Sequence, residues 1–210
     1  MSLKLTASDA LLVVDIQNDF LPGGSLAVPG GDEIVSPVNA LARRFETVVL
    51  TQDWHTPGHI SFASSHPGKE PFEVIDVPYG TQVLWPDHCI MGTEGAAFSA
   101  ELETPHAQLV IRKGYHPGVD SYSGFQEADR RTRTGLAGYL RERGVDRVFL
   151  AGLATDFCVS WTALDARTAG FAAIVIEDAT RAIDTNGSLD EAWRLMSAAG
   201  VERIRIAGVL

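Results

Sequence analysis

The chain has 210 residues, of which 45% are hydrophobic and 21% charged, with 17 lysines and arginines against 27 aspartates and glutamates. Such a composition is typical of one globular domain that buries a core of its own. The formal net charge of -10 argues against nucleic acid and against an anionic membrane as partners, because both bind basic protein surfaces.

The cysteine count and the hydropathy pattern bear on where the protein works. Cys89 and Cys158 are the only cysteines, too few for a disulfide framework in a chain of this length. The N-terminus lacks the apolar core and cleavage site of a signal peptide, and no apolar run approaches the ~20 residues that span a bilayer. We therefore expect a cytoplasmic protein with reduced thiols.

Short apolar runs alternate with helical patterns along the chain. In chain order, strands are predicted at residues 11–16, 47–53, 108–114, 147–153, 172–179 and 203–206, and helices at 32–45, 131–144, 159–170 and 188–200. This alternation predicts a single α/β domain over residues 1–210, a three-layer α/β/α arrangement with a mostly parallel six-stranded sheet. The Pro-, Gly- and His-rich segment 56–105 is too long for a plain connection, which indicates a functional role.

Four chemically capable residues stand where predicted strands end. Asp15, Asp53 and Lys113 come at the ends of the first three strands, and Cys158 follows the fourth. Ligands of open α/β sheets bind beyond the carboxyl ends of the strands, so we expect these four side chains to share one site.

Cys158 lies between a predicted strand and the helix that follows it. Thr155 and Asp156 are residues of the helix-capping type, so the thiol is expected at a helix N-terminus, where the helix dipole stabilises a thiolate. Free backbone N–H groups there can hold an oxyanion. Asp15 is a candidate base if burial raises its pKa, with Lys113 as the charge between the two. The alternatives are an inert buried cysteine and a structural Asp15–Lys113 ion pair.

A second group of residues has the chemistry of metal ligands. Asp53 and His55, two residues apart in extended backbone, point the same way, and His59 follows across a Pro-Gly turn. His88 comes later in the irregular segment. One carboxylate and up to three imidazoles suit Zn²⁺, Fe²⁺ or Mn²⁺, whereas the alternative is a set of surface histidines. Cys89, which no helix start follows, is interpreted as a packing residue.

Five stretches of the chain resemble one known family. They are DIQNDFLPGGSLAV, TQDWHTPGHISFAS, LWPDHCIMGTEGAAF, IRKGYHPGVDSYSGF and GLATDFCVSWTALDA, in this order between about residues 15 and 178. Together they are similar to the nicotinamidases, within the isochorismatase-like cysteine hydrolases. The resemblance implies the isochorismatase-like hydrolase fold. The loop from Lys113 to Tyr122 leaves the breadth of substrates open.

The resemblance implies roles for particular residues of this chain. It implies a catalytic triad of Asp15, Lys113 and Cys158, and an oxyanion hole at the backbone N–H groups of Ala154 and Cys158. A cis peptide is then expected between Leu153 and Ala154. The implied metal ligands are Asp53, His55, His59 and His88. Some members of the family use only the aspartate and two of the histidines. The implied pocket walls are Phe20, Leu26, Trp85 and Tyr122.

The function that the resemblance implies is amide hydrolysis. A metal-dependent amidohydrolase would convert nicotinamide to nicotinate and ammonia through a cysteine thioester, in NAD salvage, with pyrazinamidase activity beside it. The ring would lie between Phe20 and Trp85. One divalent metal ion is implied, with zinc favoured over iron or manganese, and no organic coenzyme.

Two other functions stay open at this point. The first is a related amidase that acts on another carboxamide. The second is a non-catalytic, metal-stabilised binding protein of the same fold, in which Cys158 would be an inert thiol. The sequence also leaves open a homo-oligomer, because a core-facing and an interface-facing apolar stripe of a helix look alike.

Overall fold

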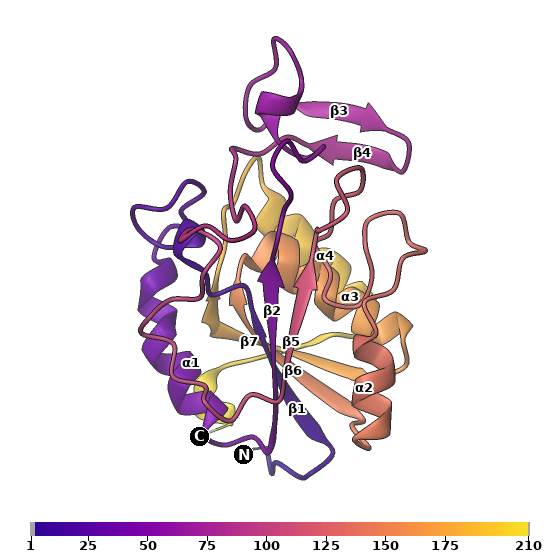
Figure 1. The fold of residues 1–210 in the computed structure, drawn as a ribbon. Coiled ribbons are helices and arrows are strands. Elements are labelled where there is room, and N and C mark those ends of the chain that lie inside the picture. The colour runs from indigo at the N-terminus through magenta and orange to yellow at the C-terminus, as the bar shows by residue number, and fades with distance from the viewer. Residues whose placement is uncertain (1–2, 210) are drawn as a thin grey trace.

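A six-stranded parallel sheet forms the centre of the computed structural model, which describes residues 3–209 (Figure 1). Its spatial order is β5-β2-β1-β6-β7-β8, and every neighbouring pair is parallel. The strands are β1 (Asp9–Val14), β2 (Thr47–Asp53), β5 (Leu109–Lys113), β6 (Arg147–Leu153), β7 (Ala172–Arg181) and β8 (Glu202–Ile204). All six predicted strands therefore exist, and the three-layer α/β/α prediction is confirmed.

Helices cover both faces of the sheet (Figure 1). They are α1 (Val35–Ala42), α2 (Leu136–Glu142), α3 (Ser160–Thr168) and α4 (Ser188–Ala198). Shorter helical turns are η1 (Asn18–Phe20), η2 (Gly31–Ile34), η3 (Ala63–Ser65), the π-helical η4 (Thr155–Val159) and η5 (Ile206–Gly208). The four predicted helices are thus present, each shorter than its sequence pattern.

Alternating residues of β1 supply two separate cores. Leu11 and Val13 pack in the core that includes α1. Leu12 and its neighbours on the other side pack with α2, α3 and α4, for example with Leu136 and Met196. Side chains of a strand point to opposite faces in turn, so a strand buried on both faces needs the continuous apolar run that this sequence has.

An antiparallel hairpin was not foreseen from the sequence. It consists of β3 (Val74–Val77) and β4 (Gly80–Val83), and it stands beyond the carboxyl ends of the sheet strands, at the top of Figure 1. The hairpin belongs to segment 56–105, for which the sequence indicated only an irregular, functional region. Its strands are short and largely exposed, so they lack the apolar pattern that identifies a strand.

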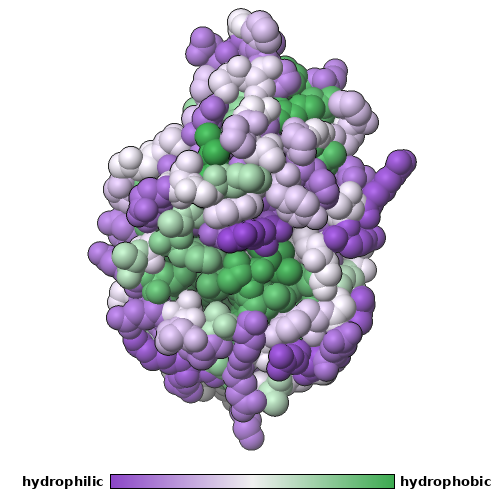
Figure 2. Space-filling view, in the orientation of Figure 1, coloured by the Kyte–Doolittle hydropathy of each residue, from purple (hydrophilic) through white to green (hydrophobic). Residues whose placement is uncertain are grey.

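One face of the molecule carries an apolar patch. Figure 2 shows apolar residues gathered in the middle of the face where the edge strand β5 lies, and Val110 of that strand is 44% exposed. Among the residues that the structure describes, no helix has the length and apolar character needed to cross a bilayer.

Candidate active site

Cys158 lies where β6 gives way to α3. The chain leaves β6 at Leu153, passes through a cis peptide bond to Ala154, and forms the turn η4, in which Cys158 is buried. The cis bond is the one that the resemblance implied. Helix α3 begins two residues later at Ser160. The thiol is therefore held at the strand-to-helix turn, beyond the carboxyl end of the sheet, as predicted.

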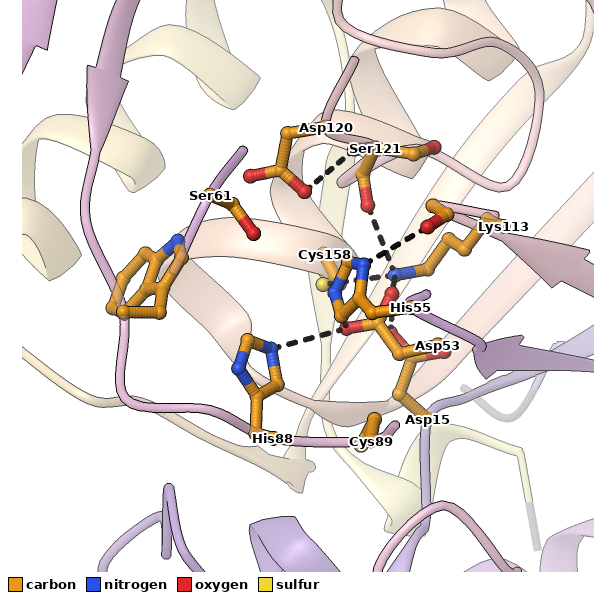
Figure 3. Close-up of polar contacts among 12 residues, drawn as sticks. Asp15, Asp53, His55, Ser61, His88, Cys89, Lys113, Asp120, Ser121 and Cys158 are labelled. Carbon is orange, nitrogen blue, oxygen red and sulfur yellow. Dashed lines mark hydrogen bonds and ion pairs between the residues drawn. The ribbon is translucent and has the colours of Figure 1, made fainter. Parts of the chain in front are cut away.

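Three predicted catalytic side chains meet at this edge of the sheet (Figure 3). Lys113 ends β5, and its Nζ lies 2.8 Å from Asp15 Oδ2 and 3.3 Å from Cys158 Sγ. Asp15 follows β1 directly, and its Oδ1 accepts a 2.6 Å hydrogen bond from the Thr51 hydroxyl. Parallel strands that end together bring these groups within contact, although they are up to 143 residues apart in sequence (158 − 15).

The Asp15 carboxyl is set up to take a proton. Burial raises its pKa above the usual value, and the positive charge of Lys113 only partly offsets this effect. The residue also has a left-handed backbone, with φ of 48°. A non-glycine residue in that conformation is uncommon and is held there by its surroundings, which is a frequent feature of active sites.

The Cys158 thiol differs from the sequence expectation of a helix-stabilised thiolate. Burial raises its pKa well above the usual value, while the Lys113 ammonium acts in the opposite direction. The cost of burying a charge therefore outweighs the benefit of the helix terminus. A carboxylate oxygen of Asp15, one of Asp53 and the Cys158 sulfur all lie within 4.8 Å of one another. The thiol thus keeps its proton in the resting state, with a carboxylate close enough to receive it.

Three of the four predicted metal ligands face one another. Oxygen or nitrogen atoms of Asp53, His55 and His88 lie within 4.8 Å of one another, and all three residues are buried. Asp53 Oδ2 is 3.6 Å from His55 Nε2 and 3.7 Å from His88 Nε2. One carboxylate and two imidazole nitrogens form a donor set suited to a divalent transition metal.

The hydrogen bonds of the two imidazoles also fit a metal. His55 Nδ1 lies 3.0 Å from the carbonyl oxygen of Gly114, and His88 Nδ1 lies 2.8 Å from that of Pro86. A carbonyl only accepts hydrogen bonds, so each Nδ1 carries a proton and each Nε2 is the nitrogen that faces Asp53 and can bind a cation. This is the arrangement that orients histidine ligands in metal sites.

His59 lies beside His55, with ring centroids 4.4 Å apart, and its nitrogen lies within 4.8 Å of ligand atoms of His55 and Asp120, but not in the group with Asp53 and His88. Its Nε2 lies 2.9 Å from the carbonyl oxygen of His116 and 3.2 Å from that of Val119, and its Nδ1 lies 2.7 Å from the Ser61 hydroxyl. Burial lowers its pKa to about 4, so the ring is neutral at pH 7 with its proton on Nε2. The lone pair on Nδ1 accepts a hydrogen bond, and no lone pair is left for a cation in this arrangement.

A small cavity lies beside the thiol and the three ligands. It is lined by Phe20, Asp53, His55, Trp85, His88, Asp120, Tyr122, Ala154, Phe157, Cys158 and Ile183. Three of the four residues implied as pocket walls, Phe20, Trp85 and Tyr122, therefore line the cavity. The fourth, Leu26, is buried in the hydrophobic core that also contains Phe20, and it does not line the cavity.

Sequence reasoning missed three residues of the cavity wall, Asp120, Phe157 and Ile183. Phe157 carried a usable signal, because it directly precedes Cys158, the predicted nucleophile. Asp120 and Ile183 lie in loops whose path depends on tertiary contacts. Cys89, by contrast, is fully buried in the core, as its interpretation as a packing residue requires.

The chain matches a known protein family. The chain belongs to the isochorismatase family, whose "Isochorismatase domain" matches residues 9–207. It is 57% identical over 210 residues to the nicotinamidase of Acinetobacter baylyi, and the matched region covers 100% of this chain and 98% of that protein. The chain is a hydrolase that acts on an amide bond.

Two solved structures extend the comparison. A nicotinamidase and pyrazinamidase of Acinetobacter baumanii superposes with a TM-score of 0.97 at 58% identity, covering 99% of this chain and 100% of that one. The pyrazinamidase of Pyrococcus horikoshii in complex with zinc has a TM-score of 0.77 at 37% identity, covering 94% and 99%.

Proposed function

We propose that this hydrolase converts nicotinamide to nicotinate and ammonia through a thioester on Cys158. The observation that carries the proposal is the position of Lys113 Nζ, which lies 2.8 Å from Asp15 Oδ2 and 3.3 Å from Cys158 Sγ. The relatives named nicotinamidase support the substrate. Such a reaction belongs to the salvage of NAD from its breakdown product.

Proton transfer from the thiol to Asp15 begins the reaction. The raised pKa of the Cys158 thiol keeps the proton on sulfur until a substrate carbonyl is next to it. The raised pKa of Asp15 makes its carboxylate a better acceptor for that proton. As sulfur attacks the carboxamide carbon, Asp15 accepts the thiol proton, and the carbonyl oxygen gains the negative charge. The backbone N–H groups of Ala154 and Cys158 are the proposed donors to that oxygen.

The second half of the reaction reverses the proton flow. Asp15 gives its proton to the departing nitrogen, ammonia leaves, and a thioester of nicotinic acid stays on Cys158. A water molecule then attacks the thioester carbon and loses a proton to Asp15. The bond between this carbon and sulfur breaks, Asp15 returns the proton to the Cys158 thiolate, and the acid leaves as nicotinate after losing its own proton to solvent. Lys113 stays protonated throughout. Burial opposes its charge, but the carboxylates of Asp15 and Asp53 outweigh this and raise its pKa well above the usual value.

We assign the metal to Asp53, His55 and His88. Their donor set and the Nδ1 hydrogen bonds of the two histidines support this assignment, as does the zinc complex of the pyrazinamidase from Pyrococcus horikoshii. What a divalent cation supplies there is Lewis acidity at the wall of the cavity, which helps to orient a ring with a lone pair. His59 is left out of the ligand set, because both of its nitrogens already have hydrogen-bond partners.

The cavity suits a small aromatic ring, but only with slight movement. Phe20, Trp85, Tyr122 and Phe157 surround it with flat apolar faces. The free space of the cavity is about 20 Å³, which is room for about one water molecule. A planar ring therefore enters when an aromatic side chain moves. Phe157 and Tyr122 are only half-buried, whereas Phe20 and Trp85 are buried.

Ammonia release from a panel of amides tests the proposal. The purified protein is expected to hydrolyse nicotinamide and pyrazinamide, and to hydrolyse benzamide, which lacks the ring nitrogen, much more slowly. Activity should fall with a chelator and return with zinc. A better turnover of an unrelated carboxamide would identify another amidase of this fold, and no release from any amide would favour a binding protein.

A further inference from the structure

Gln82 is an unusual residue of the β3–β4 hairpin. It is 1% exposed, and in the two strands of the hairpin it is the single buried position. A buried side-chain amide is costly unless its donors and acceptor find partners. The partners of Gln82 therefore show what this position is built for.

The amide of Gln82 reaches the wall of the cavity. Its Nε2 lies 2.7 Å from Asp120 Oδ2 and 3.1 Å from the Tyr122 hydroxyl, and both residues line the cavity. It also lies 2.6 Å from the carbonyl oxygen of Val83. On its other side, the Tyr79 hydroxyl donates to Gln82 Oε1 at 2.8 Å. A carboxylate only accepts hydrogen bonds, so the amide is fixed with its N–H groups toward Asp120.

The Tyr122 hydroxyl joins this network to a second wall. It accepts a 3.0 Å hydrogen bond from Trp85 Nε1, so Gln82 and Trp85 both donate to the same oxygen. The rings of Trp85 and Tyr122 meet edge to face with their centroids 6.3 Å apart. Because the cavity has so little free space, a small rotation of either ring changes whether a planar ligand fits.

We propose that Gln82 is a positioning residue for ligand binding: it holds Asp120 and Tyr122 at the cavity wall and so sets the affinity for the aromatic amide. The inference rests on the proposed function. It also assigns a purpose to the hairpin, which contributes no residue to the catalytic triad or to the metal ligands. Gln82 acts through the wall and does not contact the triad, so its loss should affect binding more than the chemical step.

The test compares wild type with Gln82→Leu, which keeps the size of the side chain and removes its amide. The KM for nicotinamide should rise about tenfold, the usual cost of a lost positioning hydrogen bond, with a much smaller change in kcat. Iodoacetamide should label Cys158 at the wild-type rate, but nicotinate should protect the thiol only at correspondingly higher concentration. Gln108→Leu is the matched control, because Gln108 is exposed and lies outside the cavity lining.

A double-mutant cycle with Tyr122→Phe shows whether Gln82 acts through the wall. The KM increase of the double variant should be smaller than the product of the two single increases, since both substitutions remove the hydrogen bond between Gln82 and Tyr122. A wild-type KM for Gln82→Leu, or KM increases that multiply, would overturn the inference. If Gln82→Leu does not fold, Tyr79→Phe replaces it and should raise KM in the same direction. Failure of the wild type to hydrolyse nicotinamide or bind nicotinate would instead reject the proposed function.

Discussion

Lys113 is the residue whose contacts join the proposed nucleophile, Cys158, to the proposed metal site. Its fully buried ammonium lies 2.8 Å from Asp15 Oδ2, 2.5 Å from Asp53 Oδ1 and 3.3 Å from Cys158 Sγ. Asp53 thus shares its two oxygens between the lysine and the two histidines. One cation balances two carboxylates that could not otherwise be buried side by side, so the proposed catalytic groups and the proposed metal-binding groups depend on each other.

Gly114 offers a test of the proposed metal site from outside the ligand set. It has φ of 69°, and a Cβ atom there would lie 2.5 Å from Cε1 and 2.7 Å from Nδ1 of His55. Gly114→Ala should therefore push the imidazole aside and lower zinc affinity by about 10- to 100-fold, as loss of a ligand-orienting contact does. Competition with a chelator measures this.

The matched control is Gly118→Ala in the same loop, where an added Cβ would meet nothing within 4 Å. Its zinc affinity should equal that of wild type. Equal zinc affinity in Gly114→Ala and Gly118→Ala would show that the position of His55 does not matter to the metal.

Residue types at strand ends were enough to predict that Asp15, Asp53, Lys113 and Cys158 lie together, because the carboxyl ends of parallel strands share one edge of the sheet. Their catalytic roles were implied only by the family resemblance. The environment of each group was harder to predict. The raised pKa of Cys158 follows from its depth of burial, which a sequence does not show. The direction of the His59 ring likewise depends on where the loop with His116 returns.

At the scale of elements, β1 and β6 are joined at their N-terminal ends by an ion pair. Arg147 Nε donates to Asp9 Oδ1 at 2.6 Å and its Nη2 to Oδ2 at 2.8 Å. Burial disfavours the charge of Asp9, but the hydrogen bonds from Arg147 and Thr6 outweigh it and hold the pKa of the carboxyl below its usual value. Bidentate hydrogen bonds between an arginine and a carboxylate are stronger than single ones.

Asp9→Asn should lower the free energy of unfolding by about 1–3 kcal/mol at pH 7. A carboxyl with a lowered pKa stabilises the fold above its unfolded pKa and loses this effect as pH falls through the folded value. The difference between variant and wild type should therefore shrink below about pH 4. Urea unfolding at several pH values measures it.

Glu103→Gln is the control for this ion pair, because it breaks the exposed pair of Arg43 and Glu103. Its effect should stay under about 1 kcal/mol. A pH-independent difference for Asp9→Asn would mean that packing, not charge, is what the substitution disturbs.

The elements themselves were largely predictable from sequence, with one exception. Continuous apolar runs identified the six sheet strands, since a strand covered on both faces needs them. The hairpin gives no such signal: in β4 only Gln82 is buried, and it is polar. Its position is set by contacts to Asp120 and Tyr122, about 40 residues further along the chain.

At the scale of the whole molecule, the proposed metal ties together segments that secondary structure alone leaves separate. Asp53 ends β2, His55 follows it, and His88 comes from the irregular segment after the hairpin. A ligand that binds only the folded state raises stability in proportion to the logarithm of its concentration over its dissociation constant. Metal occupancy should therefore be visible in the stability of the entire domain.

Removal of the metal by a chelator should lower Tm by about 5–10 °C, and zinc should restore it. In His88→Ala the chelator should cause little further change, because one ligand is already lost. Cys158→Ala should keep the full shift, since the thiol is not a ligand. Scanning calorimetry of the three proteins checks this, and an unchanged Tm in wild type would argue against the assigned ligands.

Assembly is the property of the whole molecule that the sequence left open. Apolar residues gather on the face where the edge strand β5 lies, and Val110 of this strand is 44% exposed (Figure 2). In the sequence, this strand looks like any other core strand. Apolar periodicity reports that a residue seeks burial, and it is silent on whether the cover comes from the same chain. Fold class, by contrast, follows from the order of elements alone.

Nicotinamide turnover by Cys158→Ala, measured as ammonia released over time beside wild type, tests the central claim most directly. We expect steady release by wild type and a fall on the order of 10⁴-fold or more in the variant, because the attacking sulfur is lost. Zinc content should be equal in both proteins. Release by the variant at a rate near that of wild type would contradict attack by sulfur.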